Sequence, residues 1–288
     1  MEDALIDKLT RSLPEGYHTI VGIGDDCAVT QSPKKGELLL LKTDCIVEGI
    51  HFEKNAPGKW VGWKALCRAI SDVAACGGIP THALITFAAP SDVSQRRLQS
   101  VYLGIERAAR QFDIGIIGGE SSRSPSSFFL SVTLTGSVLR RHLILRSGAH
   151  PGDSLFVTGR LGGSLRRQHH LKFTPRLMEA RWLATHIPIH AMMDLSDGLG
   201  SDLPRMAKAS RTGFEIQPTL LPRTPGCSVE QAISDGEDYE LLFAIPPKKE
   251  AFLIQQWPFP RLKLTKIGYM TAHPKRSTPL ARGYDHFK

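Results

Sequence analysis

The sequence has few aromatic residues, no paired cysteine motif and no long apolar run. Only 7% of its 288 residues are aromatic, and its five cysteines are an odd number without a C-x-x-C pair. A disulfide framework and a zinc ribbon are therefore not expected. No apolar run approaches the about 18 residues that cross a bilayer, and the acidic, mixed N-terminus does not have the pattern of a signal peptide. We expect a cytoplasmic protein that contacts no membrane.

Common catalytic signatures are also missing. The sequence contains no G-x-x-x-x-G-K-[ST] phosphate loop, no H-R-D followed by D-F-G, and no G-x-S-x-G turn. Each of these motifs defines the active site of a large class of enzymes. We therefore do not expect a P-loop NTPase, a protein kinase or an α/β-hydrolase.

Positive charge is in excess but is not concentrated. The net charge is +8, and the basic residues are spread out apart from modest groups at 140–142 and 166–170. A nucleic-acid interface needs basic residues on one face, and for single strands also stacking aromatics. We therefore expect no nucleic-acid partner, whereas an anionic small molecule fits the charge equally well.

Hydrophobic periodicity predicts mixed secondary structure in both halves. Apolar residues recur at spacings of three and four over 61–76 and 98–112, which indicates two amphipathic helices, and 128–138 alternates like a strand. After a turn at 150–153, the second half again alternates predicted strands and helices. The pattern predicts an α+β protein of two lobes, residues 1–140 and 141–288.

Carboxylates recur at predicted strand ends beside glycine. Asp26, Asp44, Glu120, Asp194 and Asp197 all lie in such segments. A single Asp-Gly step is usually only a turn, but so many in one basic protein favour a shared site. Asp72 differs because it lies inside a predicted helix among small and apolar neighbours. Hard oxygen ligands from several loops are typical of magnesium bound with substrate phosphates.

Several motifs together resemble one family over nearly the whole chain. They include G-I-G-D-D-C-A (22–28), K-T-D-x-x-V-E-G-I-H-F (42–52), G-G-E-S-S-R (118–123), D-L-S-D-G-L (194–199) and G-E-D-Y-E-L-L-F (236–243). Their order and spacing resemble the thiamine-monophosphate kinases, of the aminoimidazole ribonucleotide synthetase superfamily. The resemblance implies a two-lobed α+β fold and a homodimer built from the N-terminal lobe sheets.

The resemblance also implies an activity and its residues. The activity would be direct in-line phosphorylation of thiamine monophosphate to thiamine diphosphate, with ATP as co-substrate and several Mg²⁺ ions. No general base is expected, because a phosphate monoester with a second pKa of about 6 is already largely dianionic at neutral pH. The implied magnesium ligands are Asp26, Thr43, Asp44, Asp72, Glu120, Asp194 and Asp197; the implied ATP contacts are Gly119, Glu120, Arg146 and Ser196; the implied substrate contacts are His51 and Glu237.

Two positions and one segment depart from the family pattern. Glu120 stands where aspartate is usual, and Ala281 stands where the family can carry an aromatic residue that stacks on thiamine. Tyr284 or Trp257 would then have to close the substrate pocket. The segment 159–181 is compact and strongly basic, where family members often have a longer helical segment.

Two alternatives remain open. One is another ATP-using enzyme of the superfamily, such as a selenophosphate or an aminoimidazole ribonucleotide synthetase. Selenophosphate synthetases usually have a reactive Cys or selenocysteine ahead of the metal site, and this chain has no Cys before Cys27. The other alternative is a non-catalytic nucleotide- or thiamine-binding regulator, which Glu120 and Ala281 would favour.

Overall fold

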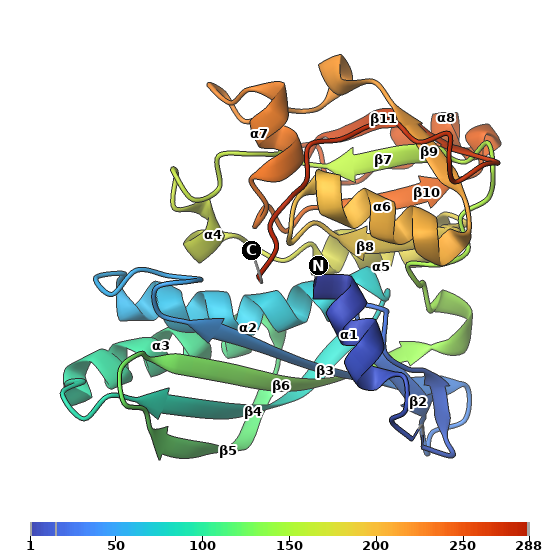
Figure 1. The fold of residues 1–288 in the computed structure, drawn as a ribbon. Coiled ribbons are helices and arrows are strands. Elements are labelled where there is room, and N and C mark those ends of the chain that lie inside the picture. The colour runs from blue at the N-terminus through green and yellow to red at the C-terminus, as the bar shows by residue number, and fades with distance from the viewer. Residues whose placement is uncertain (1, 15, 287–288) are drawn as a thin grey trace.

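The first half of the chain forms an antiparallel sheet with one parallel edge pair, covered on one face by two long helices (Figure 1). The structure is a computed structural model that describes residues 2–14 and 16–286. The strand order is β1-β2-β3-β6-β4-β5, with β4 and β5 parallel. The elements are α1 (Glu2–Thr10), β1 (Thr19–Val21), β2 (Ala28–Gln31), β3 (Glu37–Val47), α2 (Gly58–Ala75), β4 (Ile79–Ala89), α3 (Gln95–Phe112), β5 (Gly115–Arg123) and β6 (Phe129–Leu139).

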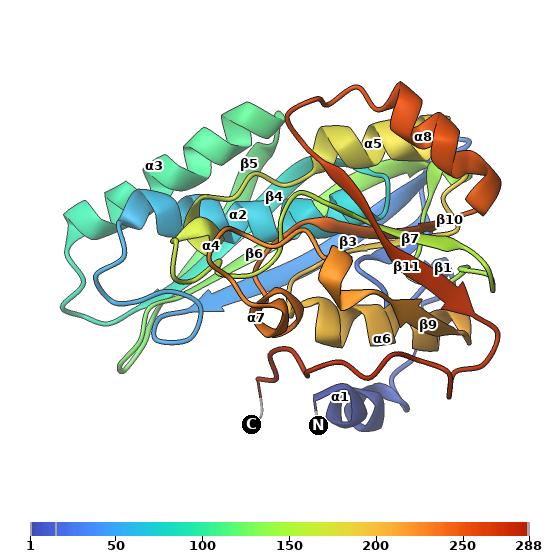
Figure 2. The ribbon, with the colours of Figure 1, turned by 90° about the horizontal axis from the view of Figure 1, so that it is seen from above.

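The second half forms a five-stranded antiparallel sheet with helices on both faces (Figure 2). The strand order is β8-β10-β7-β11-β9. The elements are β7 (Ser154–Thr158), α4 (His169–Lys172), α5 (Leu177–His186), β8 (Ala191–Asp194), α6 (Leu199–Ser210), β9 (Gly213–Ile216), α7 (Val229–Ser234), β10 (Leu241–Ile245), α8 (Glu250–Gln256) and β11 (Leu264–Thr271).

Helices α2 and α3 approach closely enough that their backbones touch. A Cβ atom added at Gly62 would lie 1.9 Å from the Val101 carbonyl oxygen, and one at Gly104 would lie 1.9 Å from the Lys59 carbonyl oxygen. Only glycine fits at these two positions, because the atoms that a Cβ would meet belong to the backbone of the other helix and cannot rotate away. The glycine pair holds α2 at a fixed distance from the outer helix.

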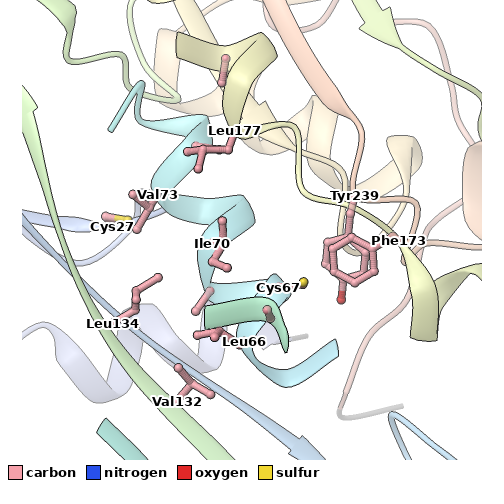
Figure 3. Close-up of a cluster of buried hydrophobic side chains, with 14 of the residues drawn as sticks. Cys27, Leu66, Cys67, Ile70, Val73, Val132, Leu134, Phe173, Leu177 and Tyr239 are labelled. Carbon is pink, nitrogen blue, oxygen red and sulfur yellow. The ribbon is translucent and has the colours of Figure 1, made fainter. Parts of the chain in front are cut away.

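Helix α2 lies between the two lobes and is buried against both. Leu66 and Ile70 pack in the same cluster as Leu134 of β6, while Phe173 and Leu177 approach the helix from the second half of the chain (Figure 3). The second sheet contributes alternate residues to two cores, as expected for a strand buried on both faces. Phe156 and Phe243 belong to the core shared with α2, whereas Leu155 and Val157 belong to a core under α6 and α7.

The prediction of a two-lobed α+β fold is confirmed, with differences in detail. The two glycines of G-G-E-S-S-R do not end a strand, because β5 continues through Gly118 and Gly119 to Arg123 beside β4. Helix α5 was not predicted. The first sheet ends at Leu139 and the second begins at Ser154, and the division at residue 140 stays a prediction. None of the helices in the described ranges is long and apolar enough to span a membrane.

Candidate active site

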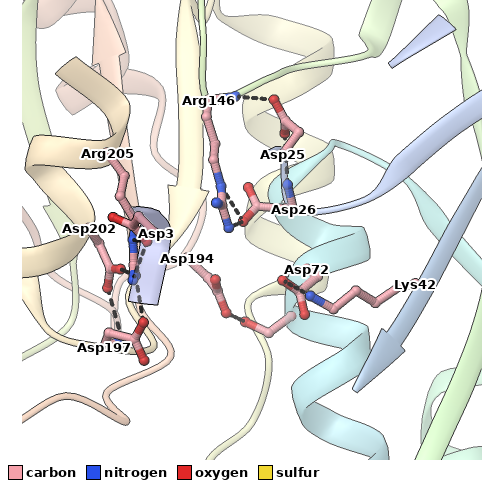
Figure 4. Close-up of polar contacts among 11 residues, drawn as sticks. Asp3, Asp25, Asp26, Lys42, Asp72, Arg146, Asp194, Asp197, Asp202 and Arg205 are labelled. Atoms are coloured by element: carbon pink, nitrogen blue, oxygen red, sulfur yellow. Dashed lines mark hydrogen bonds and ion pairs between the residues drawn. The ribbon is translucent and has the colours of Figure 1, made fainter. Parts of the chain in front are cut away.

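Acidic side chains from both halves of the chain meet in a cleft between the lobes. Asp26 precedes β2, Asp72 lies on α2 and Asp194 ends β8, and all three are buried (Figure 4). One carboxylate oxygen of each lies within 4.8 Å of the others. Asp44 of β3 lines the same cleft, which has a volume of about 550 Å³. Asp44, Asp72 and Asp194 line this cleft and Asp26 lies in the same acidic cluster, and we call it the aspartate cleft.

Basic and hydroxyl groups hold these carboxylates in place. Arg146 Nε donates to Asp26 Oδ1 at 2.9 Å, and Lys42 Nζ lies 2.9 Å from Asp72 Oδ1. The Ser71 hydroxyl donates to Asp194 Oδ2 at 2.5 Å. Charge-assisted contacts of this kind fix the orientation of a carboxylate. The cluster is therefore preorganised by the protein.

The electrostatics of the cluster favour a cation. Burial, followed by the charge of Asp26, raises the pKa of Asp194 to about 6. Burial likewise raises the pKa of Asp72 well above its ordinary value, although Lys42 opposes the shift. Asp26 Oδ2 is buried and has no hydrogen-bond partner within residues 2–14 and 16–286. Three hard oxygen donors with a free lone-pair position fit the coordination preference of Mg²⁺.

Asp44 has a different electrostatic environment from Asp72 and Asp194. Burial alone would raise its pKa, but the neighbouring Arg68 and Lys42 lower it below the ordinary value. The Arg68 guanidinium lies 3.3 Å from Asp44 Oδ1. Asp44 is therefore ionised at neutral pH and is available as a negative ligand in the cleft.

A second group of charges lies where α6 borders the cleft. Arg205 pairs with Asp197, with Asp202 at 2.9 Å and with Asp3 of α1 at 3.2 Å (Figure 4). Lys208 lies 3.4 Å from Asp7 of the same short helix. These contacts fasten α1 against α6 (Figure 2), so that the N-terminal helix lines the aspartate cleft.

A smaller pocket adjoins the aspartate cleft. We call it the histidine pocket, since His51, Glu237, Tyr284 and His286 line it. The fully buried Lys64 pairs with Glu237 and also donates to the His51 carbonyl oxygen at 2.7 Å. The pocket thus has a fixed carboxylate beside aromatic rings, and such a surface suits a flat cationic group.

His51 is neutral in this pocket. Its Nδ1 accepts a hydrogen bond from the Val47 amide at 3.1 Å. Burial, and then the positive charges of Arg68 and Lys64, lower its pKa to about 3. An imidazole whose Nδ1 accepts carries its proton on Nε2, so His51 can offer a hydrogen bond without adding a charge.

The cleft and the histidine pocket meet at a common wall. Arg68, Ser196, Asp197 and Tyr239 line both. The Tyr239 ring stacks on Phe173 with centroids 3.8 Å apart, and its buried hydroxyl has no hydrogen-bond partner in the described part of the chain. A buried unsatisfied hydroxyl is costly. Its position at the junction suits a group that contacts a bound ligand.

The structure brings together most of the residues implied by the resemblance. The aspartate cleft is lined by Asp44, Asp72, Arg146, Asp194, Ser196 and Asp197, with Asp26 in the buried cluster at its floor. His51 and Glu237 line the adjoining histidine pocket.

Three implied residues do not reach the cleft within one chain. The Thr43 side chain lies on the opposite face of β3 from Asp44, where its hydroxyl is 3.3 Å from that of Thr133. Successive residues of a strand point to opposite faces, so Thr43 cannot share the position of its neighbour. Gly119 and Glu120 lie exposed on β5, and β6 and β4 separate this strand from β3.

Several residues of the site were not anticipated from the sequence. Lys64 and Arg68 lie eight and four residues before the predicted Asp72 on α2 and therefore share one face with it, which helical periodicity could have indicated. Lys42 shares a strand face with Asp44 for the corresponding reason. Tyr239 gave no signal, because its role depends on segments far apart in the chain.

The structure also decides which aromatic residue stands near the pocket in place of Ala281. Tyr284 lines the histidine pocket. Trp257 instead packs against Trp182, with ring centroids 5.5 Å apart, in the second lobe. Of the two expected candidates, Tyr284 is therefore the one in position.

Comparison with known proteins identifies the family to which the chain belongs. Residues 24–138 match the family model of the AIR synthase related protein N-terminal domain, and residues 150–278 match that of its C-terminal domain. The thiamine-monophosphate kinase of Rhodopirellula baltica is 37% identical, with 93% of this chain and 88% of the relative covered. That of Bacillus subtilis is 31% identical, with 93% and 94% covered.

Solved structures agree. One described as "AaThiL complexed with AMPPCP and TMP" has a TM-score of 0.82 at 32% identity, covering 98% of this chain and 92% of that chain. The thiamine monophosphate kinase of Aquifex aeolicus has a TM-score of 0.79 at 30% identity, with 98% of each chain covered. The fold is that of an AIR synthase related protein. Within that class, the chain belongs to the thiamine-monophosphate kinase family.

Proposed function

We propose that this protein transfers the γ-phosphoryl group of ATP to thiamine monophosphate, forming thiamine diphosphate. The observation that carries the proposal is the junction of two unlike pockets, where Ser196, Asp197 and Tyr239 line both the aspartate cleft and the histidine pocket. The cleft suits metal-bound phosphates, and the histidine pocket suits a cationic ring. A solved relative is described as complexed with AMPPCP and TMP, an ATP analogue and the proposed acceptor.

Mg²⁺ completes the proposal for the aspartate cleft. Asp26, Asp44, Asp72 and Asp194 would hold it, and it would neutralise and align the phosphates of donor and acceptor. The chain's own contribution is to fix these four carboxylates through Arg146, Lys42, Arg68 and Ser71. No side chain has to remove a proton, because the acceptor phosphate is largely dianionic near neutral pH. Asp197 stays a proposed ligand, and Arg146 and Ser196 stay proposed ATP contacts.

The acceptor would be held in the histidine pocket. Glu237, fixed by Lys64, would face the cationic thiamine ring system, and neutral His51 would supply a hydrogen bond. Tyr284 would provide aromatic surface in the position left by Ala281. The unpartnered Tyr239 hydroxyl would contact the acceptor phosphate between the pockets.

We also propose that two copies associate through the N-terminal sheet. The sheet face away from α2 and α3 is uncovered (Figure 1), and it exposes Leu41 and Leu84 by 37% and 43%. All nine residues of β5 are exposed. A second copy on this face would give Thr43, Gly119 and Glu120 a partner surface and could bring Glu120 near the metal. Sedimentation equilibrium should give the mass of two chains, and Leu84→Glu should lower it to that of one.

The decisive assay couples ADP release to a panel of acceptors with Mg²⁺. Thiamine monophosphate should give turnover, while thiamine and unrelated phosphate monoesters should not. Turnover with a different acceptor would favour another enzyme of the superfamily. ATP binding with Mg²⁺ but without turnover would favour a regulatory binding protein. Because the reaction uses ATP and a vitamin phosphate, we propose a cytoplasmic location.

A further inference from the structure

A strongly basic pocket lies in the second lobe, outside the aspartate cleft and the histidine pocket. Its volume is about 500 Å³, within the range of small-molecule sites. We call it the basic pocket. Its walls are the segment 159–176, which includes α4 between α7 and α2 (Figure 1), and the segment 261–263 before β11. Six cationic side chains line it: Arg160, Arg167, Lys172, Arg176, Arg261 and Lys263.

Most of this positive charge is uncompensated. Two carboxylates, Asp238 and Glu240, line the pocket, and Arg176 is paired with Glu240. Within residues 2–14 and 16–286, no ion pair joins the other five cations to a carboxylate. Arg160 and Arg167 donate to the backbone carbonyls of Arg223 and Pro225 instead, and carbonyls orient them without neutralising them. Concentrated positive charge in a concave wall attracts anions.

The base of the pocket is a rigid buried network. Arg176 Nε donates to Glu240 Oε2 at 2.7 Å, and the Thr158 hydroxyl donates to the same oxygen at 2.6 Å. Gly159 has a φ of +60°, and a Cβ there would lie 2.0 Å from Glu240 Oε1. The carboxylate therefore occupies the space that a side chain would fill. A wall built in this way keeps its shape without a ligand.

The basic pocket is directly connected to the histidine pocket. The Ser164 hydroxyl donates to the Glu237 carbonyl oxygen at 2.6 Å. The Gly163 amide donates to Asp235 Oδ2 at 2.7 Å, and the Gly162 amide to Asp238 at 3.0 Å. One loop thus forms a wall of the basic pocket and is hydrogen-bonded on both sides of Glu237. These hydrogen bonds give a displacement of the loop a direct route to the backbone at Glu237.

We infer that the basic pocket binds a small molecule carrying a di- or triphosphate group, and that its occupancy alters the histidine pocket through the loop 162–164. An oligophosphate offers more charged oxygens than a single phosphate does, and so matches a wall that carries several cations. A nucleic acid fits less well, because none of the lining residues is Phe, Tyr or Trp, so that no aromatic ring is available to stack on a base. The inference does not depend on the proposed activity.

The test is calorimetric titration of the full chain with pyrophosphate and with tripolyphosphate in EDTA. EDTA removes divalent cations, without which the acidic aspartate cleft repels phosphates. Arg261→Ser with Lys263→Ser removes two charges from the pocket wall. Lys248→Ser with Lys275→Ser removes two exposed charges elsewhere in the same lobe and serves as the matched control.

The unmodified protein should bind tripolyphosphate more tightly than pyrophosphate, and about 1 M salt should weaken binding by screening. The pocket variant should lose roughly 10- to 100-fold in affinity, since it removes two charge-assisted contacts, while the control should stay within about twofold. Equal losses in both variants would show a non-specific charge effect and overturn the inference. No binding, or tighter binding of a single-stranded RNA that the pocket substitutions weaken, would also overturn it.

Hydrogen exchange tests the connection to the histidine pocket. Tripolyphosphate in EDTA should slow amide exchange in residues 159–165 and also in 235–240, because the two segments share hydrogen bonds. The pocket variant should lose both effects together. Protection confined to 159–165 would refute the connection, and protection centred on residues 22–26 would place the anion in the aspartate cleft instead.

Discussion

The aspartate cleft and the basic pocket differ in whether their lysine and arginine side chains are paired with carboxylates. Every Lys and Arg that lines the cleft is paired with a carboxylate: Lys42, Arg68, Arg146, Arg205 and Lys208. Of the six cations of the basic pocket, only Arg176 has such a pair in the described part of the chain. The comparison indicates that cations in the cleft orient acidic ligands, whereas those of the pocket are available to an anion.

The largest effect should follow from removing an acidic ligand from the cleft. Asp44→Asn keeps the side-chain shape but deletes the charge beside Arg68, so turnover should fall by roughly 10²- to 10³-fold or more. The ADP-release assay measures this, with the exposed Asp92→Asn as a matched control that should keep full activity. Circular dichroism should show that the variant is still folded. Near-normal turnover in Asp44→Asn would remove Asp44 from the proposed site.

The pair in the basic pocket should matter for stability. Arg176→Met leaves Glu240, with a side chain only 3% exposed, without its partner, which should lower the free energy of unfolding by about 3–5 kcal/mol. Arg261→Met removes an exposed, unpaired cation and should change it by less than about 0.5 kcal/mol. Urea unfolding of the two variants measures the contrast. Equal changes in the free energy of unfolding would mean that the ion pair of Arg176 with Glu240 does not set Arg176 apart from the unpaired Arg261.

The protonation of Asp194 should make the stability of the protein depend on pH. The raised pKa of Asp194, about 6 against an ordinary 3.8, means that the folded protein holds this proton more tightly than the unfolded chain. Its contribution to stability is therefore complete below about pH 4 and is lost as the pH rises through about 6. Mg²⁺ requires the ionised carboxylate, so its stabilising effect should grow over the same interval.

Melting curves at about pH 5 and about pH 7 test this proton linkage. For the metal-free protein, the difference in melting temperature between wild type and Asp194→Asn should change with pH, and Mg²⁺ should raise the wild-type value more at the higher pH. Asp92→Asn should follow the wild type throughout. Parallel curves for wild type and Asp194→Asn would contradict the raised pKa.

The smallest effect should come from the contacts that hold α1 against α6. Asp3 and Asp7 have side chains 54% and 64% exposed, and they pair with Arg205 and Lys208. Exposed pairs contribute about 0–1 kcal/mol, so Asp3→Asn with Asp7→Asn should cost less than about 1 kcal/mol in urea unfolding. The loss should disappear at about 1 M salt, where screening acts over about 3 Å. A cost that persists in salt would mean that α1 is held by more than charge.

Sequence reasoning predicted the fold and the acidic residues of the cleft better than the arrangement around them. Asp26, Asp44, Asp72 and Asp194 were identified because family motifs fix them. Thr43 shows the limit, since a motif of adjacent letters does not record that strand neighbours face opposite ways.

The contacts of two cations of the cleft, Arg146 and Arg205, join segments far apart in the chain. Arg146 was expected as an ATP contact, but its hydrogen bond to Asp26 spans 120 residues of sequence. Arg205 pairs with Asp3 across 202 residues. Periodicity along a helix or strand carries no information about such pairs. The position of Glu120 relative to the site could be predicted even less, because its proposed role depends on contact with a second chain.

Helix α2 has a consequence for how the molecule unfolds. Its apolar residues belong to one core that also contains Phe156 and Phe243 of the second sheet and Leu134 of the first. Neither lobe can lose its structure without exposing a face of this helix to water, and that exposure is unfavourable. The shared helix therefore couples the two lobes into one cooperative unit, although each has its own sheet and its own family model.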